Sequence, residues 1–264
     1  MNIIKQSFEI LEQEDWRTWG AEKQVEKVGR TCYKSEDKIT TNSYKDFVAR
    51  MVASKHFAML EHGTLYMEIS ATFDNYDEVK KYQTNPYSRV NVVDNKAYIT
   101  TNLRVIYEND WLNDFRYLCE PTEYHELRIC VKFTCNRQIS HEFVRHRVFS
   151  FAQESQRYCN YSKDKFSNEV KFIEPTALLN ISDKESQNYA IWYESCANAE
   201  VDYLAMIKNG ATPQEARDIL PNACATELIM TGFESDWEHF FKLRCAKDAH
   251  PQAQEIANMI KEQF

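Results

Sequence analysis

Glycine and proline are scarce in this chain of 264 residues, which contains five glycines and six prolines. Neither GxGxxG, the fingerprint of dinucleotide-binding turns, nor the P-loop pattern GxxxxGK[ST] occurs in the sequence. The sequence therefore excludes a glycine-rich phosphate loop. A phosphate-bearing ligand would have to be held by side chains and helix ends instead.

An excess of positive charge is also missing. The net charge is −8 and the isoelectric point is near 5.5, whereas general nucleic-acid binding requires a basic surface that displaces counterions. We therefore expect no nucleic-acid partner. Any anionic ligand should be held at a local site.

Long apolar runs are absent as well. No stretch approaches the roughly 18 apolar residues that would indicate a membrane span, and the first residues, MNIIKQSFEILEQEDW, carry acidic groups where a secretion signal would be apolar. We expect a cytoplasmic protein that does not contact a membrane.

The chain contains no CxxC pair. Its eight cysteines are spread along the sequence, which favours reduced, mostly buried thiols over a disulfide or zinc framework. These residues are Cys32, Cys119, Cys130, Cys135, Cys159, Cys196, Cys224 and Cys245.

What the chain does have is enough apolar material for a large core, with 43% hydrophobic and 13% aromatic residues. Alternating apolar and polar residues predict two strands that each bury one face, one from Leu65 to Phe73 and one from Leu127 to Cys135. Between them, about 75–125 has a possible hairpin at Val93-Asp94-Asn95-Lys96 and one or two short helices. We interpret this stretch as an insertion in a single domain that covers 1–264.

The remaining patterns predict helices. Apolar residues recur at helical spacing over about 41–55 and again from Tyr189 to Ile207, where Gly210 closes a long helix. Further helices are expected to begin at Asn136, at the capping boxes Thr212-Pro213-Gln214-Glu215 and Ser235-Asp236-Trp237-Glu238, and at Pro251. Strands followed by helices around one core predict an α+β fold, with an antiparallel-rich sheet packed against helices.

The stretch HEFVRHR, residues 141–147, raises the question of a zinc site. The zinc motif HExxH places two histidines four residues apart on one helix face, but His141 and His146 are five apart. They diverge by about 140° around a helix, and no third ligand follows at the usual spacing. We therefore expect no metal here.

The same stretch opens a segment rich in guanidinium, hydroxyl and amide groups, RHRVFSFAQESQRYCNYS from Arg145. A solvated polar loop is the simpler interpretation. However, arginine is the side chain suited to bidentate phosphate contact, and serine hydroxyls complete such a site. The pattern favours a phosphate or nucleotide site.

These residues resemble the flavin-dependent thymidylate synthases, whose motif is RHR, seven residues, then serine. Here Arg145-His146-Arg147 is followed by VFSFAQE and Ser155, with Ser150 and the pair Arg157-Tyr158 also in place. His56 with Glu61-His62, the segment ARDILP from Ala216, and HFFKLR from His239 resemble three other segments of the family. The matches run in order from about residue 30 to 260.

The resemblance implies transfer of a methylene group from methylenetetrahydrofolate to C5 of dUMP, with reduction by FADH2 that NADPH regenerates. It also implies a homotetramer with active sites shared between subunits. Arg244 would be the catalytic residue, since a positive charge against the uracil ring favours negative charge on N3 and O2 and makes C5 a better nucleophile.

The resemblance also assigns site residues. It implies that dUMP is bound by Glu142, Arg145, Gln153, Glu154, Ser155, Arg157, Arg217 and Arg244. It implies that FAD is bound by His56, Arg145, His146, Arg147, Gln153 and His239.

Several positions depart from the family pattern. Glu142 replaces a common glutamine, Ala152-Gln153 replaces Asn-Glu, and Ala58 replaces a threonine. Phe233 and Ser235 stand where many members have an asparagine and an arginine that touch flavin, and His239 aligns with a further asparagine. The arginines assigned to the substrate are intact.

Two other functions remain open at this stage. One is a related flavin enzyme that adds a hydroxymethyl group to a pyrimidine nucleotide, which the altered positions Gln153 and Glu142 make conceivable. The other is a nucleotide-binding protein without catalysis. A third possibility concerns mechanism: Cys159, beside Arg157, could attack the ring as a thiolate, although the sequence supplies no matching base.

Overall fold

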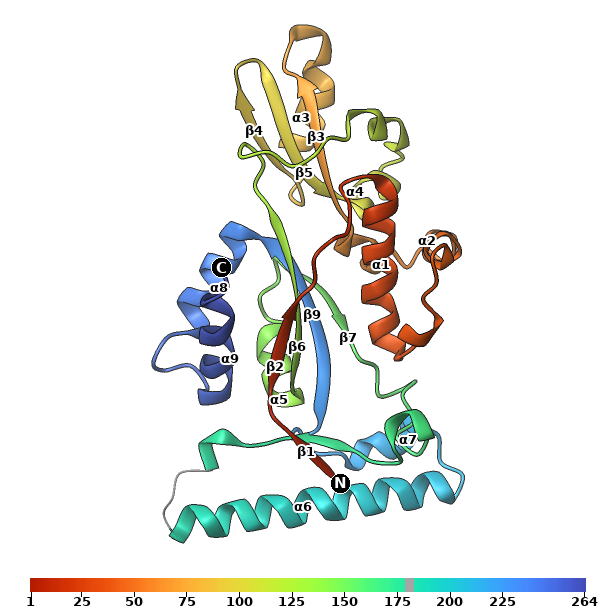
Figure 1. Cartoon of the computed structure of the whole chain (residues 1–264), viewed down its shortest axis with the longest axis vertical. Coiled ribbons are helices and arrows are strands. Elements are labelled where there is room, and N and C mark those ends of the chain that lie inside the picture. The colour runs from red at the N-terminus through yellow and green to blue at the C-terminus, as the bar shows by residue number, and fades with distance from the viewer. Residues whose placement is uncertain (179–182) are drawn as a thin grey trace.

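A four-stranded antiparallel sheet forms the centre of the fold in the computed structural model, which describes residues 1–178 and 183–264 (Figure 1). Its strand order is β2-β6-β9-β7, with bounds β2 Ser7–Ile10, β6 Arg128–Asn136, β7 Ser150–Gln153 and β9 Ala225–Phe233. The longest pairing joins β6 and β9 from Arg128 opposite Phe233 to Asn136 opposite Ala225. The strand predicted over 127–135 is therefore confirmed as β6.

A second antiparallel sheet, of order β3-β5-β4, forms where the predicted insertion adds two strands to β3. It is seen at the top of Figure 1, and its strands are β3 Thr64–Ser70, β4 Arg89–Val93 and β5 Lys96–Asn102. The hairpin is confirmed, because Asp94 and Asn95 have φ values of 48° and 59°, as a type I′ turn requires. Two short helices, α3 Tyr76–Gln83 and α4 Leu103–Glu108, are confirmed too.

The first predicted strand needs two corrections. β3 ends at Ser70, and Phe73, expected to face the core, is 95% exposed because a short turn of 3₁₀-helix begins there. Tyr66, expected on the outer face, is buried and packs edge-on against His125 at 5.5 Å between ring centroids. Both faces of β3 are covered, because residues from the end of the insertion pack on the second face.

Three helices cover one face of the central sheet, α5 Arg137–Phe143, α8 Glu234–Arg244 and α9 Pro251–Lys261 (Figure 1). Their shared core is aromatic and includes Phe133, Phe143, Trp237 and Phe240. The expected helix starts at Asn136 and Pro251 are confirmed. The capping box at Ser235 is wrong: α8 begins at Glu234, the Asp236 carboxylate accepts from the backbone N–H of Phe233, and the Ser235 hydroxyl donates to Glu126.

Other helices flank the two sheets. α1 Thr18–Tyr33 packs in a core with residues of both sheets, and α2 Ser43–Ala53, which confirms the helix expected over 41–55, packs on α1. The long α6, Asp183–Lys208, crosses one end of the molecule beside α7 Pro213–Ala216 and a short parallel pair, β1 Asn2–Ile4 with β8 Lys171–Ile173 (Figure 1). Gly210, with φ of 99°, closes α6 as expected, and Thr212 forms the expected capping box.

The α+β class with antiparallel sheets is thus confirmed, and so is the state of the cysteines. All eight thiols are free, and six of them are buried. Within 1–178 and 183–264, no helix has the length and apolar character that crossing a bilayer would demand. The division into one domain with an insertion stays a prediction.

The cap of α5 gives a test of this fold. The Asn136 side chain accepts from the N–H of Ile139 at 2.8 Å and donates to Gln252 of α9 at 3.2 Å. Asn136→Ala should lower the free energy of unfolding by about 1 to 2 kcal/mol, because both bonds are lost and a helix N–H is left unsatisfied. Urea titration measures this change.

Asn42→Ala is the matched control. Asn42 occupies the same position before α2, but its exposed side chain caps none of the described backbone N–H groups. It should therefore change the unfolding free energy little. Equal losses in both variants would contradict the assigned cap.

Candidate active site

Arg244, at the end of α8, is fixed against the turn that follows α5. Its Nη1 donates to the Glu142 carboxylate at 2.6 Å, and its Nη2 donates to the Glu142 backbone carbonyl at 2.8 Å. Its Nε donates to Nε2 of His146 at 2.9 Å. A guanidinium has five N–H groups, so two remain without a partner in the described part of the chain and can contact a ligand.

His146 is buried in the same group and carries no charge at neutral pH. Burial, with smaller effects from Arg244 and His239, lowers its pKa from 6.5 to about 4. Its ring lies 5.0 Å from Phe240 and 6.4 Å from His239, measured between centroids. The fold therefore joins two predicted flavin residues, His146 and His239, with the predicted catalytic residue.

Arg147, the next residue, lines a cavity of about 490 Å³, a volume typical of small-molecule sites. The cavity is bounded by both sheets and by the short helix 57–62. Its lining residues are Ala58, Glu61, Pro86, Tyr87, Arg89, Asn102, Arg128, Arg147, Val148, Phe149, Ser150, Phe151, Gly232, Phe233 and Asp236. Ala58 and Phe233, two positions that depart from the family pattern, lie here. His56 and Arg145 are exposed and are not part of this lining.

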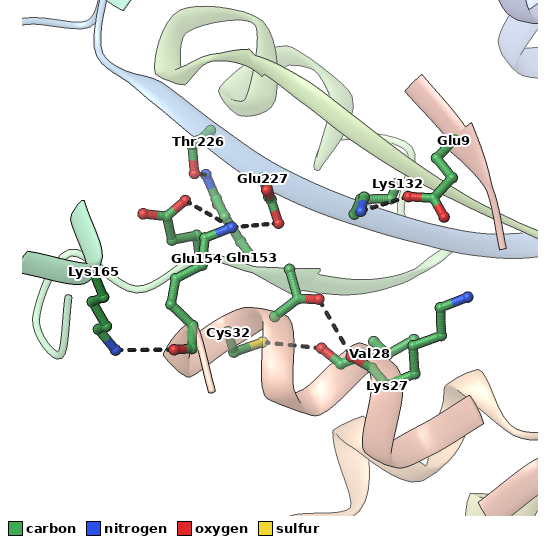
Figure 2. Close-up of polar contacts among 12 residues, drawn as sticks. Glu9, Lys27, Val28, Cys32, Lys132, Gln153, Glu154, Lys165, Thr226 and Glu227 are labelled. Carbon is green, nitrogen blue, oxygen red and sulfur yellow. Dashed lines mark hydrogen bonds and ion pairs between the residues drawn. The ribbon is translucent and has the colours of Figure 1, made fainter. Parts of the chain in front are cut away.

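Two predicted nucleotide residues on β7 and just after it make internal contacts. The Gln153 amide donates to the Ser140 hydroxyl at 2.9 Å. It also donates to the Thr226 hydroxyl at 3.3 Å (Figure 2). Gln153 is partly exposed, so one face of its side chain stays accessible.

Glu154 points into the protein instead. Its carboxylate accepts from the Tyr161 hydroxyl at 3.0 Å. It also lies 3.8 Å from the ammonium of Lys34, which pairs with Glu227 as well; Glu154 and Glu227 are labelled in Figure 2. Burial raises the pKa of Glu154. In a single chain the Glu154 side chain therefore belongs to an internal charge cluster.

The loop after β7 meets α7. Nε of Arg157 donates to Gln214 at 3.1 Å, and Arg217 follows three residues later at the end of α7. The Ser155 backbone N–H donates to the Cys32 carbonyl at 3.0 Å and ties this loop to the end of α1. The fold thus brings Arg157 close to the segment that carries Arg217.

In one chain the predicted site residues form three groups: the Arg244 group, the cavity at Arg147, and the Arg157 loop with α7. Sequence reasoning missed Arg89 and Arg128, which line the cavity. Neither residue belongs to a motif, and only the folding of the insertion onto the central sheet brings them together.

The lowered pKa of His146 predicts a loss of stability in acid. Between pH 6.5 and about 4 the unfolded chain binds a proton that folded His146 does not. The stability that depends on this neutral ring is fully present above pH 6.5. It is lost as the pH falls toward 4, because protonation favours the unfolded chain. His146→Gln should therefore reduce, by roughly 2 kcal/mol, the drop in unfolding free energy between pH 7 and 4.5 measured in urea.

His56→Gln is the control, because this ring is exposed and should leave the pH profile unchanged. Some acid sensitivity will remain in His146→Gln, since burial also lowers the pKa of His62 to about 3. If His146→Gln and the unmodified protein have the same profile, the assignment of a neutral buried ring is wrong.

Comparison with known proteins places this chain in a family. Residues 118–264 match the family described as thymidylate synthase complementing protein. The chain is 34% identical over 122 residues to the flavin-dependent thymidylate synthase of Geobacter sulfurreducens, covering 46% of this chain and 49% of the relative. It is 31% identical over 129 residues to that of Pyrococcus abyssi, covering 48% and 50%.

The chain therefore spans about half the length of the curated relatives it matches. A solved structure, the UMP/dUMP methylase PolB from Streptomyces cacaoi bound with 5-Br dUMP, aligns with 100% of this chain and 92% of its own, at a TM-score of 0.49 and 15% identity. Because the family match includes more than half of the sequence, the chain belongs to the flavin-dependent thymidylate synthases.

Proposed function

We propose that the chain catalyses the reductive methylation of dUMP to dTMP, with methylenetetrahydrofolate as carbon donor and NADPH as the source of electrons through FAD. The observation that carries this proposal is the fixed guanidinium of Arg244, which keeps two N–H groups for a ligand beside neutral His146. Family membership supplies the reaction class.

Arg244 acts on the pyrimidine by electrostatics. C5 of uracil is a weak nucleophile, and it becomes stronger when negative charge on N3 and O2 is stabilised. Glu142 and His146 hold the guanidinium by three hydrogen bonds, so the charge does not have to be reoriented as the ring reacts. Glu142 is thus a positioning residue in addition to its predicted contact with dUMP.

The cavity at Arg147 suits a flavin, because guanidinium groups and aromatic rings line it together. Arg147 would hold FAD there, with His146 and His239 from the adjoining group and with His56, Arg145 and Gln153 completing the predicted set. When bound, the flavin supplies the hydride for the reduction. The role of the protein is to bind and orient it and to exclude water.

The nucleotide phosphate and sugar are assigned to the loop after β7. Ser155, Arg157 and Arg217 carry groups suited to an anion, together with Arg145 and Gln153. Glu154 lies in the same loop, but its carboxylate faces Tyr161 and Lys34 in the interior and is not available to the phosphate. In our proposal this loop serves the Arg244 group of a neighbouring subunit in a homotetramer. No hydrogen bond or ion pair joins the two groups among residues 1–178 and 183–264 of one chain, which supports this arrangement.

Arg244→Ala tests the proposed function. The unmodified protein should form dTMP anaerobically from dUMP, methylenetetrahydrofolate, NADPH and FAD, and the variant should lose at least about 100-fold of that rate, as expected for a main electrostatic contact. The melting temperature should change little, because Arg244 and Glu142 are both partly exposed. Product chromatography measures the rate and identifies the product.

Lys242→Ala, on an exposed part of the same helix, is the matched control and should keep the full rate. Unchanged turnover in Arg244→Ala would refute the catalytic assignment. A hydroxymethylated nucleotide in place of dTMP would favour the hydroxymethylating alternative, and a colourless protein without product would favour a nucleotide-binding role.

Cys159→Ala tests the thiolate mechanism. Cys159 is fully buried, and burial, followed by the charge of Glu154, raises the pKa of its thiol to about 12. A nucleophilic cysteine needs a lowered pKa. Cys159→Ala should therefore retain dTMP formation within about twofold, since it removes no reacting group.

Cys196→Ala, another buried thiol of the same apolar cluster, controls for general loosening of the core. A loss of more than about 100-fold in Cys159→Ala alone would establish a covalent mechanism and exclude the one proposed.

A further inference from the structure

The cavity at Arg147 carries more positive charge than its own carboxylates neutralise. Three arginines line it against two acids, Glu61 and Asp236. Glu61 pairs with Arg104 outside the cavity at 2.5 Å, and Asp236 accepts the backbone N–H of Phe233 and lies 3.7 Å from Arg89. Arg128 and Arg147 have no ion-pair partner among residues 1–178 and 183–264, so the cavity favours an anionic ligand.

Arg128, the first residue of β6, is the most deeply placed of the three arginines. It donates to the Glu61 carbonyl at 2.9 Å, to Thr64 at 3.3 Å and to Ser150 at 3.4 Å, all neutral acceptors. Its Nε is sheltered from solvent and has no partner among residues 1–178 and 183–264, where no carboxylate lies within ion-pair distance of it either. Burial accordingly lowers its pKa.

Arg128 is half-buried with its Nε shielded from water. A desolvated cation without a counter-ion is costly, and an anion in the cavity would offset that cost.

Arg89 comes from the inserted sheet and is held loosely. It lies 3.5 Å from Glu126 and 3.7 Å from Asp236, and it donates to the carbonyls of Ser88 and Pro86 at 3.2 and 3.4 Å. Charge-assisted hydrogen bonds are normally 2.7–2.9 Å long. The donors of Arg89 are thus free to turn to a better acceptor, in contrast to those of Arg244.

The ring of Phe233 lies between these arginines. Its centroid is 4.3 Å from the guanidinium carbon of Arg89 and 5.4 Å from that of Arg128. Cation–π contacts with one ring thus place both guanidinium groups at the same wall of the cavity. Two guanidiniums at one wall, beside further aromatic residues, suit a ligand that carries phosphate groups on an aromatic body.

We propose that Arg89 and Arg128 bind the phosphate groups of FAD, so that the insertion 75–125 builds part of the cofactor site. This inference rests on the proposed function, which supplies the identity of the cofactor. It gives the insertion a role and adds two cofactor-binding residues that the sequence motif does not contain.

The test compares FAD with riboflavin, which has the same ring system but no phosphate. Flavin-free protein is titrated with each compound, and binding is measured by flavin fluorescence. Arg89→Gln should weaken FAD binding by about tenfold or more, as expected for loss of a charged hydrogen bond, and should leave riboflavin binding unchanged. Arg89→Lys, which keeps the charge but not the planar fork, should fall between the two.

Arg116→Gln is the matched control, an exposed arginine of the same insertion that does not line this cavity. It should bind FAD like the unmodified protein. The melting temperature of flavin-free Arg89→Gln should match that of the control, which separates a binding defect from misfolding.

An Arg89→Gln variant that binds FAD within twofold of the unmodified protein would overturn the inference, as would equal weakening of FAD and riboflavin. Either result leaves the proposed function intact if the unmodified protein still forms dTMP. Failure of the unmodified protein to bind FAD at all would overturn both.

Discussion

The pairing of β6 with β9 is the constraint on which the rest of the molecule depends. It joins two long strands over nine pairs, and each strand continues directly into a helix, α5 after β6 and α8 after β9. Both helices turn back over the same face of the sheet and bury Phe143 and Phe240 against each other. Their far ends therefore meet, and Arg244 can reach Glu142 and His146.

Much of this architecture could be predicted because it is encoded locally. Alternating apolar and polar residues predicted β6, and the capping residue Asn136 predicted the start of α5. The pair Asp94-Asn95 predicted the hairpin. Prediction was wrong where distant residues decide the outcome. Tyr66 is buried because the chain returns to cover it, and Ser235 is not a cap because its hydroxyl donates to Glu126, 109 positions away.

The candidate site also has a part that local sequence patterns predict and a part that depends on tertiary packing. The resemblance assigned His146 through the RHR motif and Arg244 through the helical segment HFFKLR, and the fold places these two residues in contact. It could not point to Arg89 or Arg128, because neither has a local pattern and their proximity results from packing between two sheets. Nor could it foresee that Glu154 turns inward, which depends on Lys34 at the end of α1.

The bond between Arg244 and His146 also settles which ring nitrogen of His146 carries hydrogen. Arginine can only donate, so Nε2 of the imidazole must be the acceptor, and the single proton of the neutral ring resides on Nδ1. The tautomer is thereby locked by a residue 98 positions away. On its opposite edge the ring can offer only an N–H, so a ligand that binds there must present a lone pair.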